Sequence, residues 1–148
     1  MGKIVVGIDG SDAAKDALRW ALDEARLRSD KIVAVHAWES PPAMPEPGPA
    51  PGFDLVGILP QVQEAGERLA KAVVEEVVGD DSDVTVEPVA VQGPAASVLV
   101  EAARDANMLV VASRGHGGFT ALLLGSVSQQ LAHHAPCPLL IHRERSSG

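Results

Sequence analysis

The sequence is poor in residue types that mark several classes of protein. It contains a single cysteine and no tyrosine, and aromatic residues make up only 3% of its 148 positions. One cysteine excludes an intramolecular disulfide framework, so we expect a protein of the reducing cytoplasm. With so few aromatic side chains, the core must be built from valine, leucine, isoleucine and alanine. That composition is typical of a parallel sheet covered by helices.

Basic residues and long apolar runs are also scarce. Twelve Lys and Arg stand against 20 Asp and Glu, for a formal net charge of −8. An acidic domain without a basic stripe argues against nucleic acid and against anionic membrane surfaces as partners. No apolar run is long enough to span a bilayer. No signal-peptide pattern precedes the first apolar run at Ile4, which fits the expected cytoplasmic location.

Short β-branched apolar runs alternate with amphipathic segments along the chain. The runs predict five strands, at residues 4–8, 32–37, 84–91, 108–112 and 139–142. Apolar residues at helical spacing predict four helices, at residues 12–28, 61–78, about 94–103 and 127–134. This alternation predicts one α/β domain, with a parallel sheet, helices on both faces and right-handed crossovers. Periodicity does not supply the strand order.

The helical segments also predict which residues face the core. Ser11 is expected to cap the first helix through its hydroxyl group. Its predicted inner residues are Ala14, Ala17, Leu18, Ala21, Leu22 and Ala25. Those of the second helix are Val62, Ala65, Leu69, Ala72, Val73 and Val77. Those of the third are Ala95, Val98, Leu99, Ala102 and Ala103.

Residues 39–60 are the least regular part of the sequence. Six prolines between positions 41 and 51 are incompatible with a regular helix or a central strand. They predict a long loop inserted in a domain of residues 1–143, with 144–148 as a frayed tail. We expect a plain mobile loop. A flap over the ligand and a proline-rich docking segment are the alternatives.

A glycine-rich stretch after the fourth strand predicts an anion site. Residues 113–118 contain three glycines, and Gly125 follows just before another predicted helix. Ser126 and Gln129 have the spacing of a capping box, which predicts a helix from about Val127. Free amides and the helix dipole at such a terminus attract negative charge. The alternative is a loop whose glycines only permit tight turns.

The same stretch carries a resemblance to the universal stress protein family, of its nucleotide-binding kind. That family's signature is glycine, two residues, glycine, nine residues, glycine, and then serine or threonine. Gly115, Gly125 and Ser126 match its last three positions, whereas Ala112 stands in the first. The resemblance extends to residues 4–11, 34–37 and 135–141.

The resemblance implies a Rossmann-like sheet in the order 3-2-1-4-5 and a homodimer formed through the fifth strand. It implies ATP as ligand, with or without Mg²⁺, and ADP, AMP or cyclic AMP as further candidates. Asp9 would address the ribose or hold Mg²⁺ with the nucleotide, and Ala37 and Val111 would frame the adenine. Backbone amides after the fourth strand would hold the phosphates. The residues expected at the nucleotide site are Gly7, Ile8, Asp9, Ala37, Val111, Ala112, Ser113, Arg114, Gly115, His116, Gly117, Gly125, Ser126, Val127 and Ser128.

We find no pattern for committed catalysis or for an intrinsic metal site. His133 and His134 are adjacent and point to different helix faces, so they do not pair on a metal. Cys137 is expected to be a small packed residue, and His36 a satisfied structural histidine. We therefore expect a binding and regulatory module of the stress response. The alternatives are a nucleotide-independent homodimeric interaction protein, a cyclic-AMP sensor and a slow ATPase.

Overall fold

The computed structural model describes residues 2–39, 55–79, 83–113 and 125–143. These residues form five strands and four helices in strict alternation. In chain order they are β1 (Lys3–Gly7), α1 (Asp12–Arg28), β2 (Lys31–Trp38), α2 (Leu55–Val78), β3 (Val86–Gln92), α3 (Ala95–Ala102), β4 (Met108–Ala112), α4 (Ser126–His134) and β5 (Leu139–His142).

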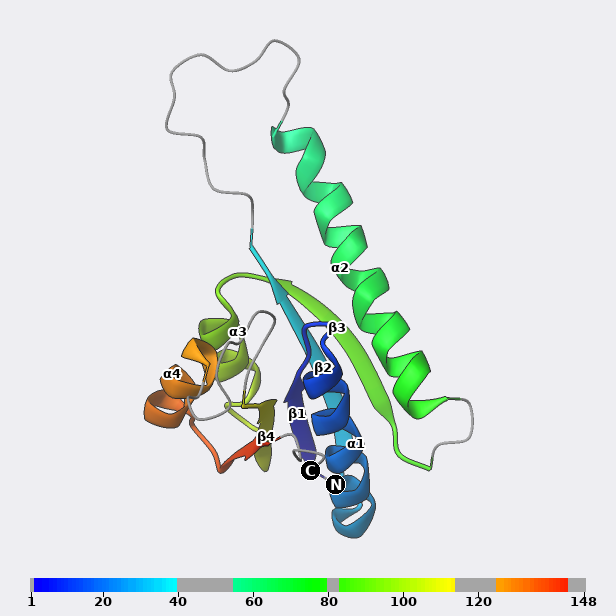
Figure 1. Cartoon of the computed structure of the whole chain (residues 1–148), viewed down its shortest axis with the longest axis vertical. Coiled ribbons are helices and arrows are strands. Elements are labelled where there is room, and N and C mark those ends of the chain that lie inside the picture. The colour runs from blue at the N-terminus through cyan, green and yellow to red at the C-terminus, as the bar shows by residue number, and fades with distance from the viewer. Residues whose placement is uncertain (1, 40–54, 80–82, 114–124, 144–148) are drawn as a thin grey trace, which may run out of the picture.

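All five strands pair in parallel in the order β3-β2-β1-β4-β5, as the resemblance implied. The central strand β1 places Val6 beside Ala34 of β2 on one side and beside Val110 of β4 on the other. Helices α1 and α2 cover one face of the sheet, and α3 and α4 cover the other (Figure 1). The strand order therefore reverses between β1 and β4, whose carboxyl ends lie next to each other. In open α/β sheets, ligands bind at such a point.

Each face of the sheet has its own aliphatic core. Because side chains alternate along a strand, Ile4 and Val6 pack under α1 and α2, while Val5 packs under α3 and α4. Leu18 fills the first core and Leu131 the second, and both are fully buried. Burying a leucine contributes about 1.5–3 kcal/mol, so the two cores hold the sheet rigid from both sides.

The structure confirms most of the predicted elements. Helix α1 and strands β4 and β5 have the predicted bounds, and the other strands differ by one or two residues at their ends. Ser11 caps α1, with its Oγ accepting the amide of Ala14 at 3.2 Å. All six predicted inner residues of α1 are buried.

Helix α2 departs from the prediction at its start. It begins at Leu55, so residues 55–60, predicted as loop, are helical and Pro60 lies inside the helix. Proline has a helical φ and deprives the helix of only one backbone hydrogen bond, which here lies near the helix start. Residues 40–54, the predicted turn at 120–124 and the tail at 144–148 lie outside the described residues.

The buried face of α2 also differs from the prediction. Ala65 and Ala72 are exposed, and Gly66 and Ala70 are buried instead. Leu69, Val73 and Val77 pack in the core as predicted. A Cβ atom at Gly66 would lie 3.2 Å from Cδ1 of Trp38. Gly66 faces β2, and its lack of a side chain allows α2 to lie close to this strand.

None of the helices in the described parts of the chain is both long and apolar enough to cross a bilayer.

Candidate functional site

The predicted site lies where the chain leaves the neighbouring strands β1 and β4. Gly7 is the last residue of β1, and a Cβ atom there would lie 3.0 Å from Cδ1 of Leu99 and 3.2 Å from Cγ1 of Val111. Val111 and Ala37, the two residues expected to frame adenine, both belong to the face under α3 and α4. The structure thus places these predicted residues on one side of the carboxyl edge.

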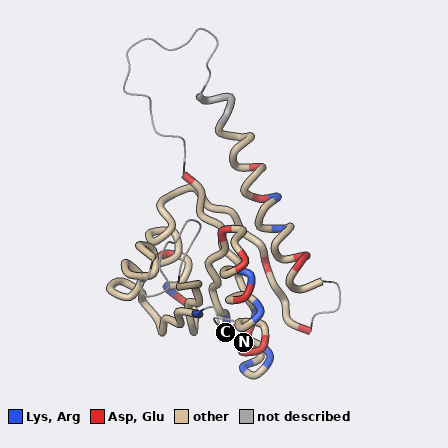
Figure 2. Tube along the Cα trace, viewed as in Figure 1, with Lys and Arg blue, Asp and Glu red and all other residues tan. Residues whose placement is uncertain are grey.

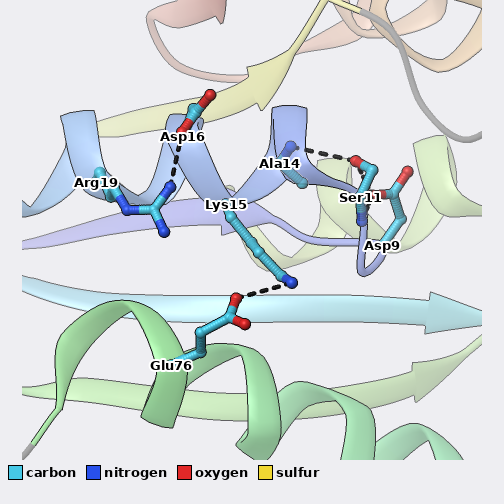
Figure 3. Close-up of polar contacts among 7 residues, drawn as sticks. All are labelled: Asp9, Ser11, Ala14, Lys15, Asp16, Arg19 and Glu76. Carbon is cyan, nitrogen blue, oxygen red and sulfur yellow. Dashed lines mark hydrogen bonds and ion pairs between the residues drawn. The ribbon is translucent and has the colours of Figure 1, made fainter.

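Asp9 shapes the turn that follows β1. Its Oδ1 accepts the Ser11 amide at 3.0 Å and the Ser11 hydroxyl at 2.6 Å (Figure 3). Gly10 has a φ of +84°, which a residue with a side chain rarely adopts. Asp9 is therefore a turn residue, whose carboxylate binds the backbone two positions ahead. Its carboxylate also sits at the sheet edge where the ligand role was predicted, so the two roles are compatible.

The N-terminus of α4 is anchored to the end of β4 by two hydrogen bonds. The amide of Gly125 donates to the carbonyl of Ser113 at 2.8 Å. The hydroxyl of the buried Ser128 donates to the carbonyl of Ala112 at 2.8 Å. These bonds join the two ends of the glycine-rich loop, so α4 begins directly beside the switch point.

The predicted capping box at this helix is wrong. Helix α4 begins at Ser126, its N-cap is Gly125, and no side-chain hydrogen bond caps it. The amide of Gln129 donates to the carbonyl of Gly125 at 3.0 Å, which makes Gly125 the residue before the first turn. Ser126 is consequently the first helical residue, with an exposed side chain.

The predicted phosphate-binding amides divide into three groups. The Ser113 amide donates to the carbonyl of His142 at 2.9 Å, so it extends the β4–β5 ladder and its prediction as a phosphate donor is wrong. The amides of Ser126, Val127 and Ser128 donate to no backbone carbonyl among the described residues. They are the orphan donors of the first helical turn. Arg114, Gly115, His116 and Gly117 lie outside the described residues.

Ala112, which replaces the first signature glycine, is partly buried. Its methyl group packs against the apolar cluster under α1 and α2. Val111, the residue before it, faces the opposite side, toward α3 and α4. The alanine side chain therefore points to the face of the sheet opposite Val111 and Ala37.

Sequence reasoning missed a cluster of side chains between β2 and α2. The Nδ1 of His36 lies 3.2 Å from the carbonyl oxygen of Ile8, in agreement with the predicted structural role of this histidine. The side chains of His36 and Trp38 in β2 both lie next to Gly66 of α2. The sequence did contain a signal for this cluster. Gly66 is the only glycine in the helix predicted at residues 61–78, and an isolated glycine in a helix often marks a close packing contact.

The sequence analysis also missed Asp30, which lies at the amino ends of the strands, opposite the predicted site. It is buried, and its carboxylate accepts the Gly2 amide at 2.9 Å and the Asn107 side-chain amide at 3.1 Å. These bonds join the amino ends of β1, β2 and β4.

Charged residues gather on α1 and α2, away from α4 and β5 (Figure 2). Lys15 of α1 pairs with Glu76 of α2 at 2.7 Å (Figure 3). The hydrogen bond from Lys15 is the main cause that lowers the pKa of Glu76 below its ordinary 4.5. The same hydrogen bond raises the pKa of Lys15 above 10.5. Residues 126–142, in contrast, contain no Lys, Arg, Asp or Glu.

The described residues offer little for redox or metal chemistry. Burial raises the pKa of the Cys137 thiol, which favours the packed, neutral form expected from the sequence. Within the described ranges, no group of three or more His, Cys, Asp or Glu side chains is placed to hold a metal ion.

Comparison with known proteins assigns the chain to a family. The model of the universal stress protein family matches residues 1–143. A universal stress protein of Mycobacterium tuberculosis is 37% identical over 144 residues, which make up 95% of this chain and 45% of that protein. The chain spans about half the length of the curated relatives it matches.

Solved structures agree with this assignment. A universal stress protein from Burkholderia pseudomallei has a TM-score of 0.65 and 26% identity, with 95% of each chain covered. A universal stress protein solved in complex with cAMP has a TM-score of 0.60 and 25% identity, with 96% of each chain covered. On its sequence, its strand order and these relatives, the chain belongs to the universal stress protein family.

Proposed function

We propose that this domain binds an adenine nucleotide at the carboxyl edge between β1 and β4 and acts as a binding and regulatory module. The observation that carries the proposal is the anchored N-terminus of α4. Three consecutive amides with no backbone acceptor in the described residues are held beside the end of β4 by the Ser128 hydroxyl. Such amides and the helix dipole suit a phosphate group.

For the remaining parts of a nucleotide we propose the residues that the resemblance to the family implied. The Asp9 turn ends β1 next to β4, where its carboxylate would meet the ribose. Ala37 and Val111 on the α3 and α4 face would contact the adenine. The universal stress protein solved with cAMP, 25% identical over 96% of this chain, supports adenine nucleotides as the ligand class.

We propose ATP as the ligand, with Mg²⁺ held through the phosphates and Asp9. ADP, AMP and cyclic AMP are the competitors to be tested beside it. We expect hydrolysis to be slow at most, because Asp9, the carboxylate of the proposed site, already accepts two hydrogen bonds from Ser11. Phosphate release over several hours measures this directly.

Thermal unfolding with added nucleotide tests the proposal. Ligand at about 100 times its dissociation constant should raise the unfolding free energy by roughly 2.7 kcal/mol and raise the melting temperature accordingly. The series should contain ATP, ADP, AMP and cyclic AMP, each with and without Mg²⁺. If none of them shifts the transition, the nucleotide proposal is wrong.

Two substitutions at Ser126 separate the amide from the hydroxyl. Ser126→Pro removes both groups, and proline is well tolerated at the first helical position. Gly125 has φ −66° and ψ 162°, which is the conformation that a following proline requires. Ser126→Ala removes the hydroxyl alone and is the matched control.

We expect Ser126→Pro to weaken nucleotide affinity beyond Ser126→Ala by about tenfold or more, since a hydrogen bond to a charged group contributes about 1.5–3 kcal/mol. Affinity for adenosine, which has no phosphate, should be the same in both variants. Titration calorimetry measures both ligands. Equal nucleotide affinity in the two variants would argue against the phosphate lying on these amides.

Ala112→Gly tests whether the alanine in the signature position matters. Because its methyl group packs under α1 and α2, we expect the wild-type chain to bind nucleotide with this methyl in place. A melting shift that appears only in Ala112→Gly would show instead that the alanine closes the site.

We also propose self-association through β5, on a separate observation. β5 is an edge strand with four half-buried residues, and Nδ1 of His142 is buried without a hydrogen-bond partner in the described part of the chain. An exposed edge is a template for strand pairing. Sedimentation analysis of wild type and Ile141→Lys should show a dimer in the first and a monomer in the second.

A further inference from the structure

Ile8, the residue before Asp9, has both of its backbone polar groups bound to β2. Its amide donates to the Val35 carbonyl at 2.9 Å, and its carbonyl oxygen lies 3.2 Å from Nδ1 of His36. A carbonyl can only accept, so the His36 Nδ1 must carry the proton in this contact. The histidine therefore holds the chain at the point where it leaves β1 for the turn.

From this point a series of hydrogen bonds leads into α1. The Asp9 carboxylate binds the amide and hydroxyl of Ser11, and the Ser11 hydroxyl accepts the Ala14 amide at 3.2 Å. Gly10 between them needs its positive φ of 84° for the turn. The direction of the Asp9 carboxylate thus depends on where the Ile8 carbonyl is fixed.

Helix α2 supports both ends of this series. A Cβ atom on Gly66 would lie 3.5 Å from Cδ2 of His36, and one on Gly10 would lie 3.5 Å from Cδ1 of Leu69. Farther along α2, Glu76 pairs with Lys15 of α1. The helix therefore lies beside the His36 ring and beside the turn, and it forms an ion pair with the helix that the turn begins.

We propose that His36 is a positioning residue that couples α2 to the Asp9 turn and so controls recognition of the ribose. This inference rests on the proposed nucleotide site, where Asp9 meets the ribose. The ring acts through the Ile8 carbonyl and does not touch the ligand. A shift of α2 over the His36 ring would reorient the Asp9 carboxylate, and the affinity for ribonucleotides would change with it.

Three variants separate hydrogen bonding from packing at this position. His36→Asn keeps a donor, because the asparagine Nδ2 occupies about the position of the imidazole Nδ1. His36→Gln keeps a polar amide of similar size but places its N–H one bond farther out. His36→Leu removes the donor and keeps the bulk. The glutamine variant also serves if the leucine variant does not fold.

The first measurement compares the affinity for AMP with the affinity for 2′-deoxy-AMP by titration calorimetry. We expect wild type to prefer the ribonucleotide by about tenfold, the effect of one hydrogen bond to a charged group. His36→Leu and His36→Gln should reduce this preference to within twofold, and His36→Asn should restore it. A residue that only stabilises the fold would lower both affinities equally and leave the ratio unchanged, and that result would overturn the inference.

The second measurement needs no nucleotide. Hydrogen exchange of the Ser11 and Ala14 amides should be about tenfold faster in His36→Leu and His36→Gln than in wild type and His36→Asn, with the Leu131 amide in α4 unchanged. If wild type binds neither nucleotide, the proposed function fails while the exchange experiment still decides the role of His36. Unchanged exchange at Ser11 and Ala14 in both variants would refute the coupling.

Discussion

At the scale of single residues, the site depends on a few positions where size or one hydroxyl group decides the geometry. Gly7 lets α3 and β4 approach the end of β1, and Ser128 ties α4 to β4. Neither role is visible in the sequence, because each requires a neighbour that only the folded chain supplies.

Gly7→Ala should destabilise the domain by about 1–3 kcal/mol, the usual effect of overpacking a filled core. The new methyl group would meet Leu99 at 3.0 Å and Val111 at 3.2 Å. Urea denaturation measures the change. In a Leu99→Ala background the same substitution should be less destabilising, and a full effect there would show that Leu99 is not the obstacle.

Ser128→Ala should lower stability by about 1–3 kcal/mol, since it removes a buried donor and leaves the Ala112 carbonyl without it. Ser126→Ala, two residues away and exposed, should change stability by less than about 0.5 kcal/mol. Chemical denaturation of both variants provides the comparison. Equal effects would contradict the anchoring role of Ser128.

At the scale of elements, α2 shows where pattern reading succeeded and where it failed. Its end at Val78 is as predicted, and Val73 is buried as predicted, but its start and the exposure of Ala65 and Ala72 are not. Proline at position 60 indicated a helix boundary, and alanine at positions 65 and 72 indicated an inner stripe. The close approach of Gly66 to β2 decided which side of the helix is buried, because packing contributes more than local propensity.

Pro60→Ala should strengthen α2, because it restores a backbone donor and removes a ring from the second helical turn. We expect a gain in stability of up to roughly 3 kcal/mol, the helix-interior cost of proline. Thermal unfolding followed by circular dichroism measures stability and helicity together. Ala65→Gly, at an exposed site of the same helix, should act in the opposite direction by about 1 kcal/mol.

At the scale of the whole molecule, ion pairs join elements that are distant in sequence. In three of them the cation lowers the pKa of the carboxylate, mainly through a side-chain hydrogen bond. These three pairs are Lys3–Asp105, Lys15–Glu76 and Arg26–Asp83. They link β1 to the loop before β4, α1 to α2, and α1 to the loop before β3.

These pairs predict a loss of stability in acid. A carboxylate with a lowered pKa in the folded state contributes stability above its ordinary value, 4.5 for Glu76 and 3.8 for Asp83 and Asp105. That contribution disappears as the pH falls through the folded pKa. The melting temperature of Glu76→Gln should therefore lie below that of wild type at pH 7 and converge with it in acid.

The carboxylates of these pairs are exposed, so the difference at pH 7 should be small and should shrink in high salt. Glu75→Gln, which changes an exposed carboxylate of the same helix, is the matched control. A constant gap between wild type and Glu76→Gln across the whole pH range would contradict the assignment.

The sequence by itself determined the number, type and order of the elements, since aliphatic periodicity is a local property that survives folding. It also located the start of α4 to within one residue. Only the tertiary structure decided which donors are used: the Ser113 amide pairs with β5, the Ser128 hydroxyl binds β4, and His36 holds Ile8. Those partners lie between 16 and 29 residues away in the chain, and no local pattern encodes such a distance.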